Sequence, residues 1–227
     1  MKQALFKFLL LASMIPFSAC LGDDVDIDSD RRILVKGKIV DIEGNPLPNM
    51  NVVTSASGDR LGQTQSDASG NFSLTSLDEE FDPLDISINM DIYNFDNIDY
   101  DYASLAYRSS VHNNRLLYDF GTIILGKRAE LNLTFNNLPG DGNTVEYNIK
   151  YTPATCELPL TVLDPPESCD LAASYEGDLN AFSENRTINI ESILGTNVIV
   201  EYSLNFEPEQ TIEIPITDLE TNYVFEY

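Results

Sequence analysis

The residues of this sequence that could do chemistry are one histidine, three cysteines and a large excess of carboxylates. His112 lies beside Asn113 and Asn114, and no G-x-S-x-G or H-E-x-x-H pattern surrounds it. A solvated loop histidine therefore explains it better than a catalytic one. Acidic pairs are frequent, so a hydrolase that uses two carboxylates is the enzymatic alternative. The chain has no tryptophan to line a sugar-binding cleft, and we predict a protein that is not an enzyme.

The first cysteine, Cys20, follows a segment with the order of a secretory signal peptide, basic, then apolar, then broken by Pro16. The apolar stretch is shorter than the ~20 residues that cross a bilayer as a helix, so we expect no transmembrane segment. Phe17-Ser18-Ala19 resembles the lipobox of bacterial lipoproteins, although Phe17 replaces the usual leucine. The resemblance implies removal of residues 1–19 and acylation of Cys20. The alternative is an ordinary signal peptide and an unmodified thiol.

Residues 20–32 are rich in aspartate and should form an extended acidic tether, because like charges repel and no apolar surface can be buried. Two or more acyl chains on Cys20 would hold the protein stably on a membrane. The pair Asp23 and Asp24 resembles the export signal that sends some lipoproteins to the outer face of the outer membrane. This implies a lipid-anchored protein of the outer membrane, exposed at the cell surface. The alternatives are the periplasmic face and, for the aspartates, a plain spacer.

Cys156 and Cys169 are the remaining pair of cysteines once Cys20 is assigned to a lipid. We predict that they form a disulfide, because such bonds persist in the oxidising compartments to which exported chains go. No C-x2-C or histidine-rich spacing indicates zinc. Closing a loop of this length should stabilise the fold by about 3 kcal/mol.

One acidic segment is a candidate calcium site. Its hard oxygen ligands suit calcium better than a transition metal, and the carboxylates concerned are Asp91, Asp96, Asp99 and Asp101. The segment has no EF-hand spacing, so an acidic surface loop is the alternative. Because tyrosines and Phe95 interleave with the acids, the segment could also be a contact surface. We expect no other cofactor.

The charge of the chain excludes nucleic acid as a partner. Removal of residues 1–19 takes Lys2 and Lys7 from the 13 basic residues and leaves 11 against 37 acidic ones, a net charge of −26. Affinity for nucleic acid comes mostly from Lys and Arg that neutralise phosphates. The remaining length suits one large or two small domains.

Apolar and polar residues alternate along most of the chain, which is the pattern of strands with one buried face. Clear examples are Leu84 to Met90, Ala129 to Phe135, Val145 to Tyr151, Val198 to Leu204, Ile212 to Ile216 and Tyr223 to Tyr227. Turn residues such as Glu43-Gly44-Asn45-Pro46 separate these runs at short intervals, as in antiparallel sandwiches and barrels. Residues 103–117 alone leave a short helix open as an alternative to a loop.

The first half resembles a known family in two stretches, VKGKIVDIEGNPLPNMNV at 35–52 and QSDASGNFSL at 65–74. They are similar to the V-x-G-x-V, D-x-x-G-x-P-L and S/T-D-x-x-G-x-F motifs of the carboxypeptidase regulatory-like domain. The matching residues are Val35, Gly37, Val40, Asp41, Gly44, Pro46, Leu47, Ser66, Asp67, Gly70 and Phe72, and Pro48 stands in place of a common glycine. The resemblance implies a prealbumin-type seven-stranded sandwich over residues 33–127. We expect a structural role for these residues, because the family is appended to proteins of unrelated function.

Residues 128–227 begin a new series of strands without those motifs. We therefore predict an all-β protein with two antiparallel β-sandwich domains in tandem, 33–127 and 128–227. The expected function is a non-catalytic surface lipoprotein that binds an envelope protein or an extracellular polymer, or serves as an accessory module of an envelope assembly. The alternative is a structural spacer that lifts a partner domain from the membrane. An exposed aromatic patch on the second sandwich would favour binding, and uniformly polar outer faces would favour the spacer.

Overall fold

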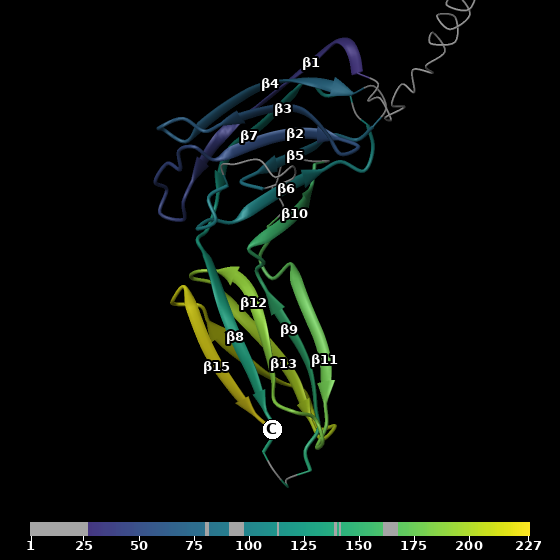
Figure 1. Ribbon diagram of the computed structural model, residues 1–227, viewed down its shortest axis with the longest axis vertical. Coiled ribbons are helices and arrows are strands. Elements are labelled where there is room, and N and C mark those ends of the chain that lie inside the picture. Colours follow the sequence, from purple (N-terminus) through teal and green to yellow (C-terminus); the bar gives the residue numbers. More distant parts are fainter. Residues whose placement is uncertain are drawn as a thin grey trace, which may run out of the picture.

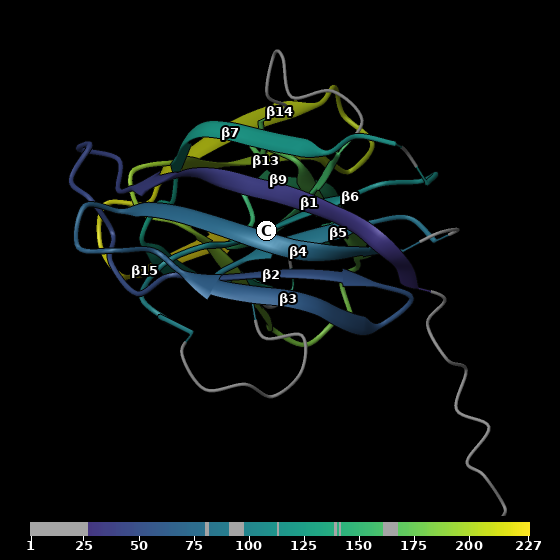
Figure 2. The same cartoon turned by 90° about the horizontal axis from the view of Figure 1, so that it is seen from above.

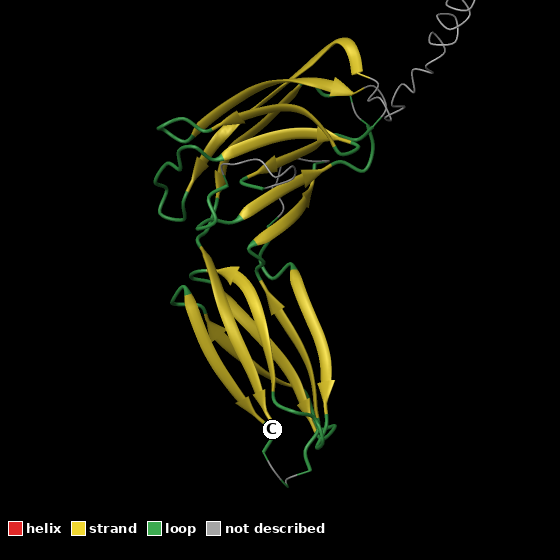
Figure 3. Cartoon of the chain, in the orientation of Figure 1, coloured by secondary structure: helices red, strands yellow, loops and turns green. Residues whose placement is uncertain are grey.

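The residues that the structure describes have β-sheet as their only regular structure (Figure 3). The computed structural model describes residues 27–79, 82–90, 98–112, 114–138, 140, 142–160 and 168–227, which form fifteen strands and no helix. The predicted all-β class is thus confirmed. Residues 103–117, for which a short helix was one of two predictions, contain a strand from Ser104 to Arg108. No helix that could cross a membrane occurs in these described ranges.

Two sheets enclose the N-terminal core, and we call them together the N-terminal sandwich (Figure 1). Their strand orders are β4-β1-β7 and β10-β6-β5-β2-β3. The strands that come from the first half of the chain are β1 (Ile27–Val40), β2 (Asn51–Ala56), β3 (Asp59–Gln65), β4 (Asn71–Glu79), β5 (Asp85–Ile88), β6 (Ser104–Arg108) and β7 (Leu117–Ile124). Seen from above in Figure 2, β4, β1 and β7 lie side by side, with β1 antiparallel to β4 and parallel to β7.

Two further sheets form the C-terminal sandwich, which lies below the first in Figure 1. Their strand orders are β11-β9-β13-β14 and β12-β8-β15. The strands are β8 (Arg128–Asn136), β9 (Val145–Tyr151), β11 (Ala173–Leu179), β12 (Arg186–Ile193), β13 (Asn197–Leu204), β14 (Gln210–Pro215) and β15 (Glu220–Glu226). The last strand ends beside the C-terminus, at the bottom of the view.

The two sandwiches share one topology. In each, the first strand is central, with the fourth strand antiparallel on one side and the seventh parallel on the other. The facing sheet has the order sixth, fifth, second, third in both cases, as β6-β5-β2-β3 and β14-β13-β9-β11, with every pair antiparallel. Of the described strands, β10 alone has no counterpart in this shared topology.

Strand β10 (Thr155–Pro159) follows β9 in the sequence but belongs to the N-terminal sandwich. It pairs in parallel with β6, from Thr155 opposite Ser104 to Pro159 opposite Arg108. Its side chains Cys156 and Leu158 pack in the N-terminal core. A segment of residues 128–227 thus completes a sheet of residues 33–127.

Each sandwich has its own hydrophobic core, filled by the alternating residues of its strands. In β8 the buried residues are Ala129, Leu131, Leu133 and Phe135, and the residues between them are partly exposed. The Phe135 ring stacks on Tyr147 of β9 with centroids 4.4 Å apart. Alternation of this kind is what the sequence predicts for a two-layered sheet.

The motif residues of the first half act in the turns. Asp67 Oδ1 accepts hydrogen bonds from the backbone N–H groups of Ser69 and Asn71, which fixes the turn before β4. These bonds lower the pKa of the Asp67 carboxyl. Gly70 has a φ of 78°, and a Cβ there would collide with the carbonyl oxygen of Ile39. The position requires glycine for both reasons.

Candidate functional site

Five of the predicted site residues lie outside the described residues. They are the lipid-attachment residue Cys20, the export residues Asp23 and Asp24, and the calcium candidates Asp91 and Asp96. Lipid attachment, surface export and calcium binding therefore stay predictions.

The two described calcium candidates belong to a turn. Both side chains are exposed, and Asp99 Oδ1 accepts a hydrogen bond of 3.0 Å from the backbone N–H of Asp101. His112 is partly exposed in the segment between β6 and β7. Where the chain is described, no three His, Cys, Asp or Glu side chains are placed to hold a metal ion.

The structure contains the predicted disulfide, with the Cα atoms of Cys156 and Cys169 6.1 Å apart. Cys156 lies on β10. Cys169 lies four residues before β11, a strand of the C-terminal sandwich, and packs against the N-terminal core. The bond therefore joins the strand that crosses to the N-terminal sandwich with the segment that returns from it.

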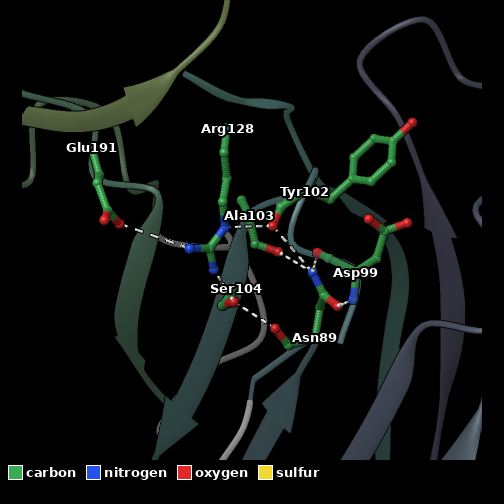
Figure 4. A network of polar contacts seen from close by, with 7 residues as sticks. All are labelled: Asn89, Asp99, Tyr102, Ala103, Ser104, Arg128 and Glu191. Atoms are coloured by element: carbon green, nitrogen blue, oxygen red, sulfur yellow. Dashed lines mark hydrogen bonds and ion pairs between the residues drawn. The ribbon is translucent and has the colours of Figure 1, made fainter. Parts of the chain in front are cut away.

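Arg128, at the start of β8, connects the two sandwiches (Figure 4). Its Nε atom donates to the carbonyl oxygen of Tyr102 at 2.7 Å, and its Nη2 atom donates to Ser104 Oγ at 2.6 Å. On its other side, Nη1 lies 3.8 Å from the Glu191 carboxylate of β12. Hydrogen bonds from a charged donor are stronger than neutral ones, so this guanidinium stabilises the junction.

Asn89 organises the N-terminal side of the same junction. Its side chain is fully buried, and Nδ2 donates to the carbonyl oxygens of Asp99, Tyr102 and Ala103 at 2.8 to 3.1 Å. Its Oδ1 atom accepts from the backbone N–H of Asp99 at 2.9 Å. The two hydrogens of Nδ2 are shared among three carbonyl oxygens, so one asparagine links four backbone groups around the turn that Arg128 contacts (Figure 4).

Small apolar residues complete the junction. Ala103, Ala154 and Ile193 form a separate buried cluster. Backbone hydrogen bonds cross it from Ala103 to Gly126 and from Ala154 to Glu191. The junction is therefore packed and hydrogen-bonded like the interior of a domain. Its polar side chains bind other groups of the protein, so we assign them a structural role.

A pocket of about 690 Å³ lies on the C-terminal sandwich, on the outer face of the sheet β11-β9-β13. Its acidic lining residues are Glu146, Glu176, Asp178, Glu201 and Glu209. Other lining residues include Asn148, Asn180, Ser203 and Phe206.

The register of the sheet places these side chains in rows. Glu176 and Glu201 flank Asn148 on neighbouring strands, and Asp178 and Ser203 flank Glu146 in the next row. Lys150, the next outward side chain on β9, is paired with Glu201 at 2.7 Å. Asn148 Nδ2 donates to Glu201 at 3.3 Å, and its buried Oδ1 atom has no hydrogen-bond donor among the described residues.

Two loops at the far end of this sheet carry exposed aromatic side chains. Phe182, between β11 and β12, is 96% exposed, and Phe206, between β13 and β14, is 81% exposed. Leu179 and Leu204, from which the loops leave, both pair with Val145. They are therefore two strand spacings, about 10 Å, apart. We call this region, residues 180–185 and 204–209, the distal loops.

Hydrogen bonds hold both distal loops. The Phe182 N–H donates to Asn180 Oδ1 at 2.9 Å, and Asn137 Nδ2 donates to the Ser183 carbonyl at 2.8 Å. In the other loop, the Asn205 N–H donates to the Thr144 carbonyl at 2.9 Å, and Asn205 Oδ1 accepts from the Thr144 N–H. The loops are thus ordered while their phenylalanines point away from the core.

The distal loops and the pocket were not among the predicted site residues. Phenylalanine within strongly polar turns, as in NAFSEN at 180–185 and LNFEPE at 204–209, is the sequence feature that could have indicated them. The acidic rows had no such signal, because they form only when three separate strands are paired.

Comparison with known proteins gives structural similarity alone. No protein-family model and no curated protein matches the chain. The TIE protein of Bacillus anthracis is similar at 11% identity and a TM-score of 0.31, over 86% of this chain and 34% of that one. This chain thus spans about a third of that protein.

Two pilus proteins are similar at the same level. The tip fimbrial protein Mfa3 of Porphyromonas gingivalis has 10% identity and a TM-score of 0.30, with 81% of each chain covered. The minor pilin GBS52 of Streptococcus agalactiae has 9% identity and a TM-score of 0.30, with 86% of this chain and 94% of that one covered. Similarity this low carries no argument about the function of this chain.

Proposed function

We propose that this protein is a lipid-anchored, non-catalytic binding protein of the bacterial cell surface, and that its distal loops form the binding end. Cys20 would carry the lipid after removal of residues 1–19, and Asp23 and Asp24 would direct export to the outer face of the outer membrane. The two sandwiches, residues 33–127 and 128–227, would place the binding end away from the membrane.

One observation carries the proposal. The most exposed aromatic side chains among the described residues, Phe182 and Phe206, belong to the distal loops, whose first residues are two strand spacings apart. These loops follow β11 and β13 at the end of the molecule opposite the start of β1 (Figure 1). Aromatic anchors on preorganised loops are typical of binding surfaces, because little conformational entropy is lost on binding. An exposed pair beside a pocket is more informative than single apolar residues, which are common on any surface.

A structural spacer is the second candidate, and the face of the sheet β12-β8-β15 favours it. Its outward side chains are mainly threonine, asparagine and glutamate, and Thr134 and Thr187 hydrogen-bond across the strands at 2.9 Å. A polar face of this kind offers no aromatic anchor. In this alternative the sandwiches would only carry a partner domain away from the membrane.

The anchor is tested with Cys20→Ser in the full-length chain. We expect the variant to remain uncleaved and unlabelled by a fatty-acid probe, because both steps need the sulfur atom. Asp23→Ala with Asp24→Ala should leave acylation intact and remove the protein from the reach of protease added to intact cells. Normal labelling of the serine variant would refute the anchor. Equal digestion of wild type and the alanine variant would refute the export role.

The binding end is tested with mature protein on arrays of glycans and envelope proteins. We expect Phe182→Ser with Phe206→Ser to abolish the wild-type signals, since the anchors are lost without a change of charge. Tyr100→Ser is the matched control, because Tyr100 is 71% exposed and lies outside the distal loops. If the double variant binds as wild type does, or if no array ligand binds wild type, the spacer is the better explanation.

A further inference from the structure

We propose that the pocket beside the distal loops binds an extended, positively charged segment of a partner protein. This inference rests on the proposed function and names the class of partner for the same end of the molecule. The binding surface consists of the outer face of β11-β9-β13 and the loop that carries Phe206.

The charge of this surface selects the partner. Residues 128–227 contain 18 acidic residues and 3 basic ones. Five carboxylates line the pocket, and Lys150, which lies on the same face of β9, is paired with Glu201. That pair is an internal example of an ammonium group bound on this face. A cationic partner would be attracted over a distance and would replace costly carboxylate repulsion by attraction.

The spacing of the carboxylates selects the shape of the partner. The Glu176 row and the Asp178 row are two residues apart along the strand, which corresponds to about 7 Å. Side chains on one face of an extended peptide repeat at the same distance. A segment with Lys or Arg at alternate positions would therefore match the rows, whereas a single small cation could meet only one of them.

Phe206 gives the surface an apolar anchor next to the acids. It lines the pocket and is 81% exposed on a loop held by the paired hydrogen bonds of Asn205 and Thr144. An aromatic face packs on the aliphatic stem of Lys or Arg and attracts its charge. The buried Asn148 Oδ1 atom, which has no donor among the described residues, adds an acceptor that an N–H group could satisfy once the surrounding side chains move apart.

The opposite face of the same sandwich provides the control. Asn132, Asn189 and Asn222 share its central row on neighbouring strands, in place of the carboxylates of the pocket. Removal of charge from β15, by Glu220→Gln with Glu226→Gln, takes away two negative charges, as Glu176→Gln with Asp178→Asn does. Any difference between the two pairs therefore reports the pocket and not the overall charge.

The experiment measures binding of the mature protein to a synthetic peptide of alternating lysine and threonine, by calorimetry at low salt. We expect binding that weakens about tenfold, or 1.4 kcal/mol, with Glu176→Gln plus Asp178→Asn and again with Phe206→Ser. The β15 control should change by less than about twofold. A peptide of alternating glutamate and threonine should not bind.

Three outcomes would overturn this inference. They are no binding of the lysine peptide, equal weakening in the pocket and β15 variants, and no effect of Phe206→Ser. The first outcome, combined with array signals that still depend on Phe182 and Phe206, would show that the distal loops bind a different class of partner. The proposed binding role itself fails if the array signals are independent of these two residues, or if wild type binds no array ligand.

Discussion

The two sandwiches have one strand order but use the connection between the second and third strands differently. In the N-terminal sandwich, Ser57 and Gly58 link β2 to β3 with φ angles of 48° and 88°, which is the two-residue turn that suits a twisted hairpin. In the C-terminal sandwich the same connection, residues 152–172, leaves the sheet, contributes β10 to the neighbour and returns. One topology thus accommodates either a tight turn or a link between sandwiches.

The two sandwiches also differ in which sheet edge is covered. Strand β10 covers the edge of β6. The strand of the C-terminal sandwich that corresponds to β6 is β14, and it is an outer strand of its sheet in the described structure. The unpaired backbone groups of an edge strand offer sites for further pairing. One sheet edge of the N-terminal sandwich is thus covered by a strand of its neighbour, and the C-terminal sandwich keeps its pocket and distal loops on the far side from that contact.

Among changes where the two sandwiches meet, removal of the disulfide should have the largest effect on stability. We expect Cys156→Ser with Cys169→Ser to lower the free energy of unfolding by about 3 kcal/mol, because the unfolded chain is no longer constrained. Urea unfolding measures the total. Hydrogen exchange should accelerate most in β6, which loses its fastened neighbour, and β14 serves as the internal control. If removal of the disulfide accelerated exchange in β14 more than in β6, β10 would not be what protects the edge of β6.

Arg128→Ala should have the next largest effect, about 2 kcal/mol, because the Tyr102 carbonyl and Ser104 hydroxyl lose a charged donor. Arg128→Lys keeps the charge but lacks the planar fork that reaches both acceptors, so it should recover only part of the loss. Full recovery by lysine, measured by urea unfolding, would mean that charge alone matters at the junction.

Acid should act through the turns of the N-terminal sandwich. Hydrogen bonds from the backbone lower the pKa of Asp67 in the folded state. The stabilisation is therefore present above the unfolded value of about 3.9 and is lost as the pH falls through the lower folded value. Asp67→Asn keeps an acceptor oxygen without titrating, so its urea midpoint should fall less than that of wild type between neutral and acidic pH. Parallel curves would refute the role of Asp67.

The sequence predicted what depends on local pattern. Alternation in β8 identifies its buried face, Asp67 and Gly70 identify the turn before β4, and the two cysteines identify their bond. The course of β10 could not be predicted in this way. Cys156 and Leu158 alternate as in any strand, and alternation does not specify which sheet receives it.

The shared topology and the pocket escaped prediction for the same reason. Strand order is set by long-range pairing, so two sandwiches can agree in topology without common motifs. Glu176, Asn148 and Glu201 are far apart in sequence and meet only through the register of β11, β9 and β13. Sequence pattern located the strands, and three-dimensional pairing assembled the surface.

Substitutions in the distal loops should have the smallest effect on stability and the largest effect on binding. Phe182 and Phe206 contribute little to the core, so replacement of either by serine should change the free energy of unfolding by less than about 0.5 kcal/mol. By contrast, Phe135→Ala removes a fully buried ring and should cost about 3 to 5 kcal/mol. Urea unfolding of the three variants makes the comparison within one sandwich. If a distal-loop variant were destabilised as much as Phe135→Ala, its phenylalanine would serve the fold, and its exposure would no longer support a role in binding.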